Sequence, residues 1–221
     1  MIRISLIPAL LAVAALALAQ TPAKTMDEKR KEVKLYGDRF KPLEYDKMTP
    51  AQKTMVDHLL EGERGGTGGP FNVTLRSPEM GDVAQNLGAQ LRYHSSLPRK
   101  LNEFAIIMTG RYLTSQYEFY AHRPLAIQAG MKESIVNAIA EGKHPEGMAP
   151  DETAVYNFAQ ELLNKKQVSD ATFKTAKDLF GERGVVDLTA VIGYYHFVSF
   201  MLNVDRYPLP AGTTPPLKPL P

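Results

Sequence analysis

The chain has 221 residues, 44% of them hydrophobic, which is enough for one domain with extensions and a buried core. Its 26 Lys and Arg residues nearly balance 24 Asp and Glu residues, so nothing in the charge favours nucleic-acid binding. The absence of cysteine excludes disulfides, thiolate metal sites, iron–sulfur clusters and any Cys-x-x-Cys redox motif.

The N-terminus has the pattern of a secretory leader. Arg3 gives it a positive start, an apolar run covers 4–18, and Ala17–Ala19 is an A-x-A cleavage site. The run is short for a membrane span, and a retained N-terminal anchor is the alternative. We therefore expect a signal peptide over 1–19, cut after Ala19, and a mature chain that is periplasmic or secreted and has no membrane span.

The chain then divides into a lead-in, a helical domain and a tail. Residues 20–48 are polar with charges of both signs, which predicts a solvated and partly ordered lead-in. The helical domain is predicted over 49–205. Its first helix begins at the capping box Thr49–Gln52 and ends at Gly62. A glycine-rich loop follows, and it lacks the Lys-Ser/Thr pair of a phosphate-binding loop.

Helical periodicity continues to the end of the domain. The helix from Pro78 carries an apolar stripe of the kind that faces a core, made of Met80, Val83, Ala84, Leu87 and Leu91. Further helices are expected from Pro98 to Leu113, from Tyr117 to Gly130 with a kink or restart at Pro124, over 133–140, over 151–164, from Ser169 to Gly181, and over 185–203.

The last of these helices is long and apolar, but Asp187 and His196 lie inside it. A core helix or a subunit interface is therefore expected rather than a membrane span. Six prolines between Pro208 and Pro221 predict an extended, polyproline-like tail over 206–221. No segment has convincing strand character. The predicted fold class is all-α, a single multi-helix domain between two extensions.

The residues that could carry chemistry gather between 103 and 130. Glu118 and His122 are four residues apart, which places both on one helical face. Such a carboxylate can orient His122 or raise its pKa, so that the imidazole carries a proton near neutral pH. Glu103 joins them if its helix packs antiparallel, and Arg111 could pair with Glu103 or anchor an anion. The alternatives are a surface ion pair, or a Glu118 that only closes a helix cap.

A metal site is the less favoured interpretation of these side chains. Glu103, Glu118, His122 and His196 offer oxygen and nitrogen ligands. However, the sequence has no HExxH motif, and the Glu-x-x-His pairs of di-iron bundles are spaced by three rather than four. We expect neither a metal nor another cofactor.

The same region resembles a known family. The segments Glu103–Ile107, 117–122 (YEFYAH) and 126–130 are similar to the signature of the carboxymuconolactone decarboxylase family, which is related to alkylhydroperoxidase D-like (AhpD-like) proteins. Weaker similarity covers most of 70–205. The resemblance implies an all-helical AhpD-like subunit that forms homo-trimers or homo-hexamers, with sites near subunit contacts.

The two branches of that group differ in chemistry. The peroxidase branch uses two cysteines, and Ser115 and Glu118 stand at the matching positions, so thiol-dependent peroxide reduction is excluded. The decarboxylase branch has Glu and His without cysteines, and it opens a carbon–carbon bond of an unsaturated lactone acid without a cofactor. The leader, the lead-in and the Pro-rich tail depart from that branch and leave the substrate open.

The resemblance implies a cofactor-free lyase or isomerase that moves protons on a small lactone or keto acid. His122 would donate or accept the proton, Glu118 would orient His122, and Glu103 would be a second acid/base or a hydrogen-bond partner. Arg76 or Arg111 would hold the substrate carboxylate. Three further side chains are expected at the pocket: Tyr117, Tyr195 and His196. The alternative function is a non-catalytic exported helical protein that binds a small apolar acid.

Overall fold

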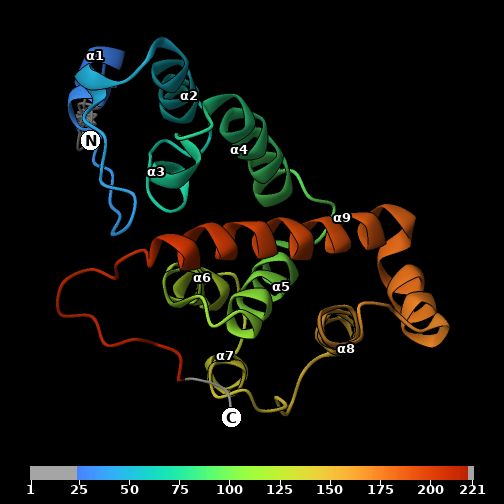
Figure 1. Ribbon diagram of the computed structural model, residues 1–221. Helices are drawn as coiled ribbons and strands as arrows, with labels where there is room; N and C mark the ends of the chain where they lie inside the picture. The colour runs from blue at the N-terminus through green and yellow to red at the C-terminus, as the bar shows by residue number, and fades with distance from the viewer. Residues whose placement is uncertain (1–23, 219–221) are drawn as a thin grey trace, which may run out of the picture.

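The computed structural model describes residues 24–218, and this part of the chain contains helices and no strand (Figure 1). The all-α prediction is confirmed, whereas the expected leader over 1–19 lies outside the described residues. The helices are α1 (Met26–Lys31), α2 (Pro50–Glu61), α3 (Phe71–Thr74), α4 (Pro78–Tyr93), α5 (Arg99–Tyr112), α6 (Gln116–Gln128), α7 (Glu133–Ala140), α8 (Pro150–Lys165) and α9 (Asp170–Asp205).

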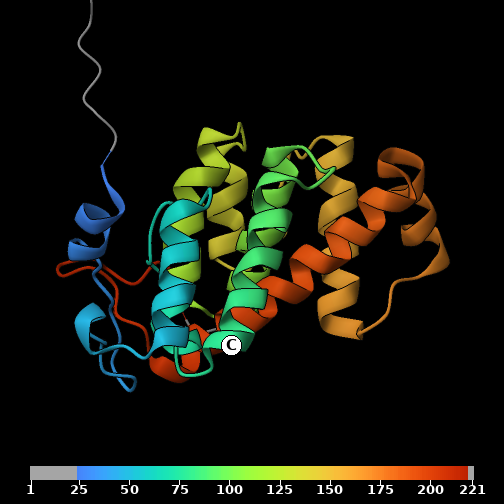
Figure 2. The same cartoon turned by 90° about the horizontal axis from the view of Figure 1, so that it is seen from above.

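Helix α5 is the centre of the main core. Every residue from Leu101 to Arg111 is buried, because α5 packs against α6, α7, α8 and α9. Helix α9 crosses the middle of the molecule, with α2, α3 and α4 on one side and α5 to α8 on the other (Figure 1). Seen from above, α2 and α4 lie side by side (Figure 2). The candidate residues of α5 and α6 therefore lie in the interior of the domain.

The lead-in is more ordered than its composition predicts. Thr25 caps α1, and Leu35 and Met48 are buried in a second apolar cluster with α2 and Phe71. The lead-in also contacts the far end of the chain. The carboxylate of buried Asp205 accepts hydrogen bonds from the backbone N–H groups of Asp38 and Phe40, at 3.2 and 2.7 Å. The expectation of a solvated lead-in is wrong for Leu35 and Met48, because the many charged residues around them in the sequence masked their apolar character.

Helix α4 buries a different face from the one that its apolar stripe predicts. Val83 is 71% exposed, and Met80 and Leu87 are exposed as well, whereas Leu91 is buried. The buried face includes Gly81 and Gly88. A Cβ atom on Gly88 would lie 2.1 Å from the Tyr194 hydroxyl, so the glycine permits close contact between α4 and α9. Close helix approach, rather than side-chain hydrophobicity, decided which face is inside.

Two helix boundaries in the second half of the chain differ from those that the sequence predicts. Helix α6 continues through Pro124 without a restart. The two helices predicted on either side of Gly181 are joined end to end as α9, with a break at Gly181, where φ is 68° and ψ is 177°. By length and composition α9 could cross a membrane, but half of its apolar stretch is buried inside the molecule.

The C-terminal tail is extended, as predicted, and it packs on its own chain. Residues 207–218 contain no helix, and Leu217 is 3% exposed in the main core. The side-chain amide of Gln116 both donates to the Leu217 carbonyl (2.8 Å) and accepts from the Leu217 N–H (3.0 Å). The tail is thus fastened to the beginning of α6.

Candidate functional site

Helices α5 and α6 bring two carboxylates to one histidine. The Glu103 carboxylate, on α5, is 2.6 Å from His122 Nδ1 and hydrogen-bonded to it. On α6, Glu118 Oε1 lies 3.1 Å from His122 Nε2 as an ion pair one helical turn away. All three side chains are buried, and His122 is only 6% exposed. The surface ion pair and the helix-cap role of Glu118 are therefore both excluded.

These carboxylates change the acidity of His122. Desolvation lowers its pKa, but Glu118 and Glu103 outweigh this effect and raise the pKa from 6.5 to about 9. His122 is then an imidazolium at neutral pH, and both ring nitrogens donate toward carboxylates. A buried imidazolium held between two carboxylates can release a proton to a bound molecule and regain one later.

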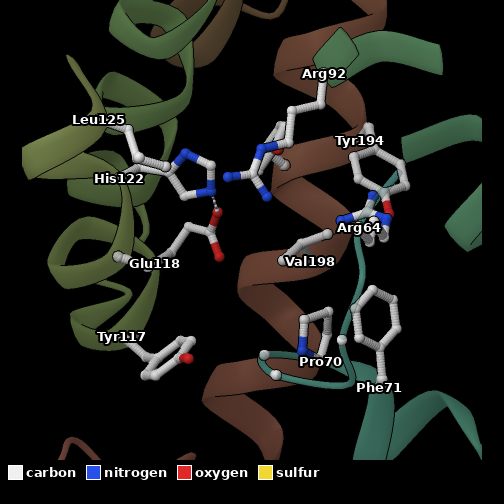
Figure 3. A pocket seen from close by; sticks show the side chains of 15 residues that line it. Arg64, Pro70, Phe71, Arg92, Tyr117, Glu118, His122, Leu125, Tyr194 and Val198 are labelled. Carbon is white, nitrogen blue, oxygen red and sulfur yellow. Dashed lines mark ion pairs between the residues drawn. The ribbon is translucent and has the colours of Figure 1, made fainter. Parts of the chain in front are cut away.

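A cavity of about 280 Å³ opens beside His122 (Figure 3). Glu118 and His122 form one wall, and the glycine-rich loop, α4 and α9 form the others. Its lining residues are Arg64, Gly66, Gly68, Gly69, Pro70, Phe71, Arg92, Tyr117, Glu118, Ala121, His122, Leu125, Tyr194, Tyr195 and Val198. Glu103 does not line this cavity, so it contacts His122 from behind. Glu118 is the carboxylate that a ligand would meet.

Two arginines that the sequence analysis missed face the cavity. In Figure 3, Arg92 points from α4 toward His122, and Arg64 lies beside Tyr194. Within residues 24–218, Arg64 Nε and Nη2 are buried atoms without a hydrogen-bond partner. Buried donors of this kind usually have a partner, so a ligand could supply it. Together the two guanidinium groups make the cavity suited to an anion.

The position of Arg64 depends on Gly88. A Cβ atom on Gly88 would lie 2.2 Å from Arg64 Nη2, so a larger residue would displace the guanidinium. The two arginines come from a loop and from the end of α4, far in sequence from Glu118. One feature of the sequence could have indicated Arg92. It is four residues from Gly88 and thus lies on the buried, glycine-containing face of α4.

A second cavity of about 290 Å³ borders Glu103. It is lined by Arg92, Tyr93, Ser95, Leu97, Arg99, Asn102 and Glu103. Arg92 thus borders both cavities. Glu103 thus borders a cavity separate from the one that His122 lines.

Among the residues predicted at a binding pocket, two lie at the cavity and three do not. Tyr117 and Tyr195 line it, and the Tyr195 ring meets the His122 ring edge-on at 5.2 Å. The structure does not bring Arg76, Arg111 or His196 to this cavity, since none of these side chains is among its lining residues.

Each of these three residues has other contacts. Arg76 donates to the backbone carbonyls of Asn72 and Lys41 and stabilises the lead-in. Arg111 donates to the Lys218 carbonyl at 2.7 Å and fastens the tail. The His196 ring contacts Tyr112 at a tilt and Phe200 edge-on, at 5.9 and 4.8 Å between ring centroids. Spacing along the helices could not reveal these distant partners.

The geometry does not assemble a metal ligand set. Within the described part of the chain, no group of three or more His, Asp or Glu side chains is placed to hold a metal ion. His196, one of the four ligands considered, lies away from Glu103, Glu118 and His122.

Comparison with known proteins identifies the fold. The chain is similar to the crystal structure of a protein of unknown function from Agrobacterium tumefaciens that has been suggested to be the antioxidant defence protein AhpD. The TM-score is 0.53 at 15% identity, over 63% of this chain and 96% of that one. No family model and no curated protein matches the chain. The likeness establishes an AhpD-like helical fold, and it does not extend to the reaction.

Proposed function

We propose that this protein is a cofactor-free lyase or isomerase that moves protons on a small organic carboxylate. The substrate class is a lactone acid or keto acid of the kind handled by the carboxymuconolactone decarboxylase branch. The observation that supports this most is the buried Glu103–His122–Glu118 group at a cavity that also holds two arginines. Thiol peroxidase chemistry is excluded because the sequence has no cysteine.

Each side chain receives a role from its position. Arg64 and Arg92 bind the substrate's anionic oxygens and stabilise the enolate charge that develops. Glu103 orients the imidazolium from behind, and His122 is the general acid. Glu118, on the cavity side, is the base. This assignment exchanges the roles that the sequence suggested for the two glutamates.

The proton balance closes without a cofactor. In a decarboxylation, the bond to the leaving CO₂ breaks and its electron pair forms an enolate. His122 then gives its proton to carbon and regains one from solvent. In an isomerisation, Glu118 removes a proton from the carbon beside a carbonyl, and His122 returns one at the new position.

We further propose that this activity is exported, because residues 1–19 have the pattern of a cleaved leader. Its natural substrate would then be met in the periplasm or outside the cell. The mature protein would have no membrane span.

The test is direct turnover. The purified protein is incubated with carboxymuconolactone and a panel of lactone and keto acids, without added metal or cofactor. Release of CO₂ and deuterium incorporation from heavy water are followed, so that lyase and isomerase activities are both detected. We expect His122→Ala and Glu118→Gln to lower kcat by about 10²- to 10⁴-fold. His58→Ala is the matched control, because His58 pairs with Asp82 on the exposed surface.

The proposal would be contradicted if no acid in the panel gave either CO₂ release or deuterium incorporation. If acids still raised the melting temperature of the native protein and not of Arg92→Gln, the site would be a binding site without catalysis. Equal turnover in the native protein and in His122→Ala would move the chemistry away from this histidine.

A further inference from the structure

A third cavity, of about 140 Å³, lies between α5, α8 and the turn that follows α7. It shares no lining residue with the cavity at His122. At about 30 Å³ for each water molecule, it has room for about four or five of them, which is enough for a small ion such as phosphate. We call it the Arg111 cavity, and its lining residues are Met108, Arg111, Tyr112, Ile139, Gly142, Lys143, Gln160, Leu163 and Asn164.

Arg111 is a buried cation whose partners are incomplete. Its side chain, on α5, is only 5% exposed. Among residues 24–218 its guanidinium makes one hydrogen bond, from Nη1 to the Lys218 carbonyl at 2.7 Å, and its Nε is buried without a partner. Burial lowers the pKa of Arg111, and no carboxylate opposes this effect. Buried charges are usually paired, so the free side of this guanidinium is suited to an anion.

The surroundings of Arg111 have an excess of positive charge. Lys143 lines the cavity, and its Nζ is 2.6 Å from the carboxylate of Glu141, which is not a lining residue. Lys143 and, more weakly, Lys218 lower the pKa of Glu141. One carboxylate therefore serves two lysines, and Arg111 adds a third cation. Since no Asp or Glu lines the cavity, an anion would meet only cations and neutral groups there.

Hydrogen-bond donors come to the cavity from three elements. Arg111 belongs to α5, Lys143 to the turn after α7, and Gln160 to α8. Gln160 Oε1 accepts from Asn164 Nδ2 at 2.8 Å, which leaves the amide N–H groups of Gln160 as donors. A tetrahedral oxyanion offers an oxygen to each of three such elements, whereas a planar carboxylate offers both of its oxygens to one side. The arrangement therefore favours phosphate over carboxylic acids.

We propose that the Arg111 cavity binds a small tetrahedral oxyanion of the phosphate class, held by Arg111 and Lys143. The anion completes the hydrogen bonds of the buried guanidinium. Because Arg111 also holds the Lys218 carbonyl, a bound anion strengthens the attachment of the tail to α5. Lys143 is exposed and already paired, so we expect a dissociation constant on the order of millimolar. The site is separate from Arg64 and Arg92 and does not depend on the proposed reaction.

Thermal unfolding in sodium phosphate tests the site. At ten times the dissociation constant, phosphate should raise the melting temperature of the native protein by about 3–6 °C. Arg92→Gln should still show the rise, and Arg111→Met should lose it. Methionine fills similar space without a charge to desolvate, so Arg111→Met should fold. Sodium acetate and sodium chloride at equal ionic strength are the controls and should give no comparable rise.

Three thermal results would overturn the proposal. The first is a native protein that does not respond to phosphate. The second is an equal rise in acetate or chloride, which would mean a general effect of salt. The third is a rise that survives in Arg111→Met and disappears in Arg92→Gln, which would place the anion in the cavity at His122.

Two exposed lysines provide matched variants that leave the buried arginine intact. The side chains of Lys143 and Lys165 are both 71% exposed and each pairs with a glutamate, but only Lys143 lines the cavity. Lys143→Gln should weaken phosphate binding by about two- to fivefold, and Lys165→Gln should leave it unchanged. Equal weakening in both variants would show attraction to net charge and would contradict a site at Arg111.

Tryptophan fluorescence locates the anion, because the native sequence has no tryptophan. Tyr112 lines the Arg111 cavity and Tyr117 lines the cavity at His122, so Tyr112→Trp and Tyr117→Trp each place one reporter at one cavity. Phosphate should change the emission of Tyr112→Trp in a saturable manner, and adding Arg111→Met should abolish the change. A response of Tyr117→Trp alone would rule out the Arg111 cavity as the phosphate site.

Discussion

At the scale of single residues, His122 should make stability depend on pH. Its pKa is raised to about 9 in the folded protein, from 6.5, so its stabilising effect is complete below about pH 6.5 and is lost as the pH rises toward 9. The native protein should lose roughly 3 kcal/mol of unfolding free energy over this range. Urea unfolding across the range measures it. His122→Gln should flatten the profile, and parallel profiles for both proteins would contradict the expectation.

A second residue-scale prediction separates two kinds of arginine. Arg92 lines the cavity and Arg76 is bound to backbone carbonyls of its own chain. Small carboxylic acids should therefore stabilise the native protein and Arg76→Gln against heat, but not Arg92→Gln. Differential scanning fluorimetry with a panel of acids makes the comparison. If Arg76→Gln alone abolished the shift, the anion site would lie at Arg76, one of the two arginines that the resemblance suggested for the substrate carboxylate.

At the scale of elements, Gly88 should be the most sensitive position of α4. A methyl group there would overlap the Tyr194 hydroxyl and the Arg64 guanidinium, so Gly88→Ala should cost about 1–3 kcal/mol and weaken acid binding. Chemical denaturation and titration with a carboxylic acid measure the two effects. Gly193→Ala is the control. Its methyl group would enter open space, so the substitution should leave the free energy of unfolding unchanged or raise it. Similar losses in both variants would point to backbone effects alone.

The sequence predicted α5 and α6 better than α4, for a physical reason. Helix α5 is rich in apolar side chains that are buried, and the i, i+4 spacing of Glu118 and His122 is a local property of α6 alone. In α4 the buried face holds Gly81 and Gly88, and close helix approach has no signature in hydrophobicity. The arginines of the cavity were missed for the same reason. Their proximity to His122 depends on how α4 crosses α9.

At the scale of the whole molecule, the tail should contribute to stability. Leu217 is buried in the main core, and Gln116 holds its backbone from both sides. Leu217→Ala should lower the unfolding free energy by about 2 kcal/mol or more. Thermal unfolding compares it with Thr214→Ala, an exposed position of the same tail. Equal melting temperatures for these two variants would show that the tail only rests on the surface.

Composition alone could not predict this role of the tail or of the lead-in. Proline density indicates an extended chain but not where it docks, and mixed charge conceals Leu35 and Met48 among polar neighbours. Both extensions depend on contacts far along the chain. The helical class was predictable because it rests on local periodicity, whereas the attachment of the two extensions was not.

The hydrogen bonds between Asp205 and the lead-in have a consequence for the order of folding. Asp38 and Asp205 are 167 positions apart, so a ribosome has made nearly the whole chain before this bond can form. Such distant pairings form late, since a long loop must close first. The segment made first is thus among the last to be secured, and until then its apolar residues stay accessible to chaperones.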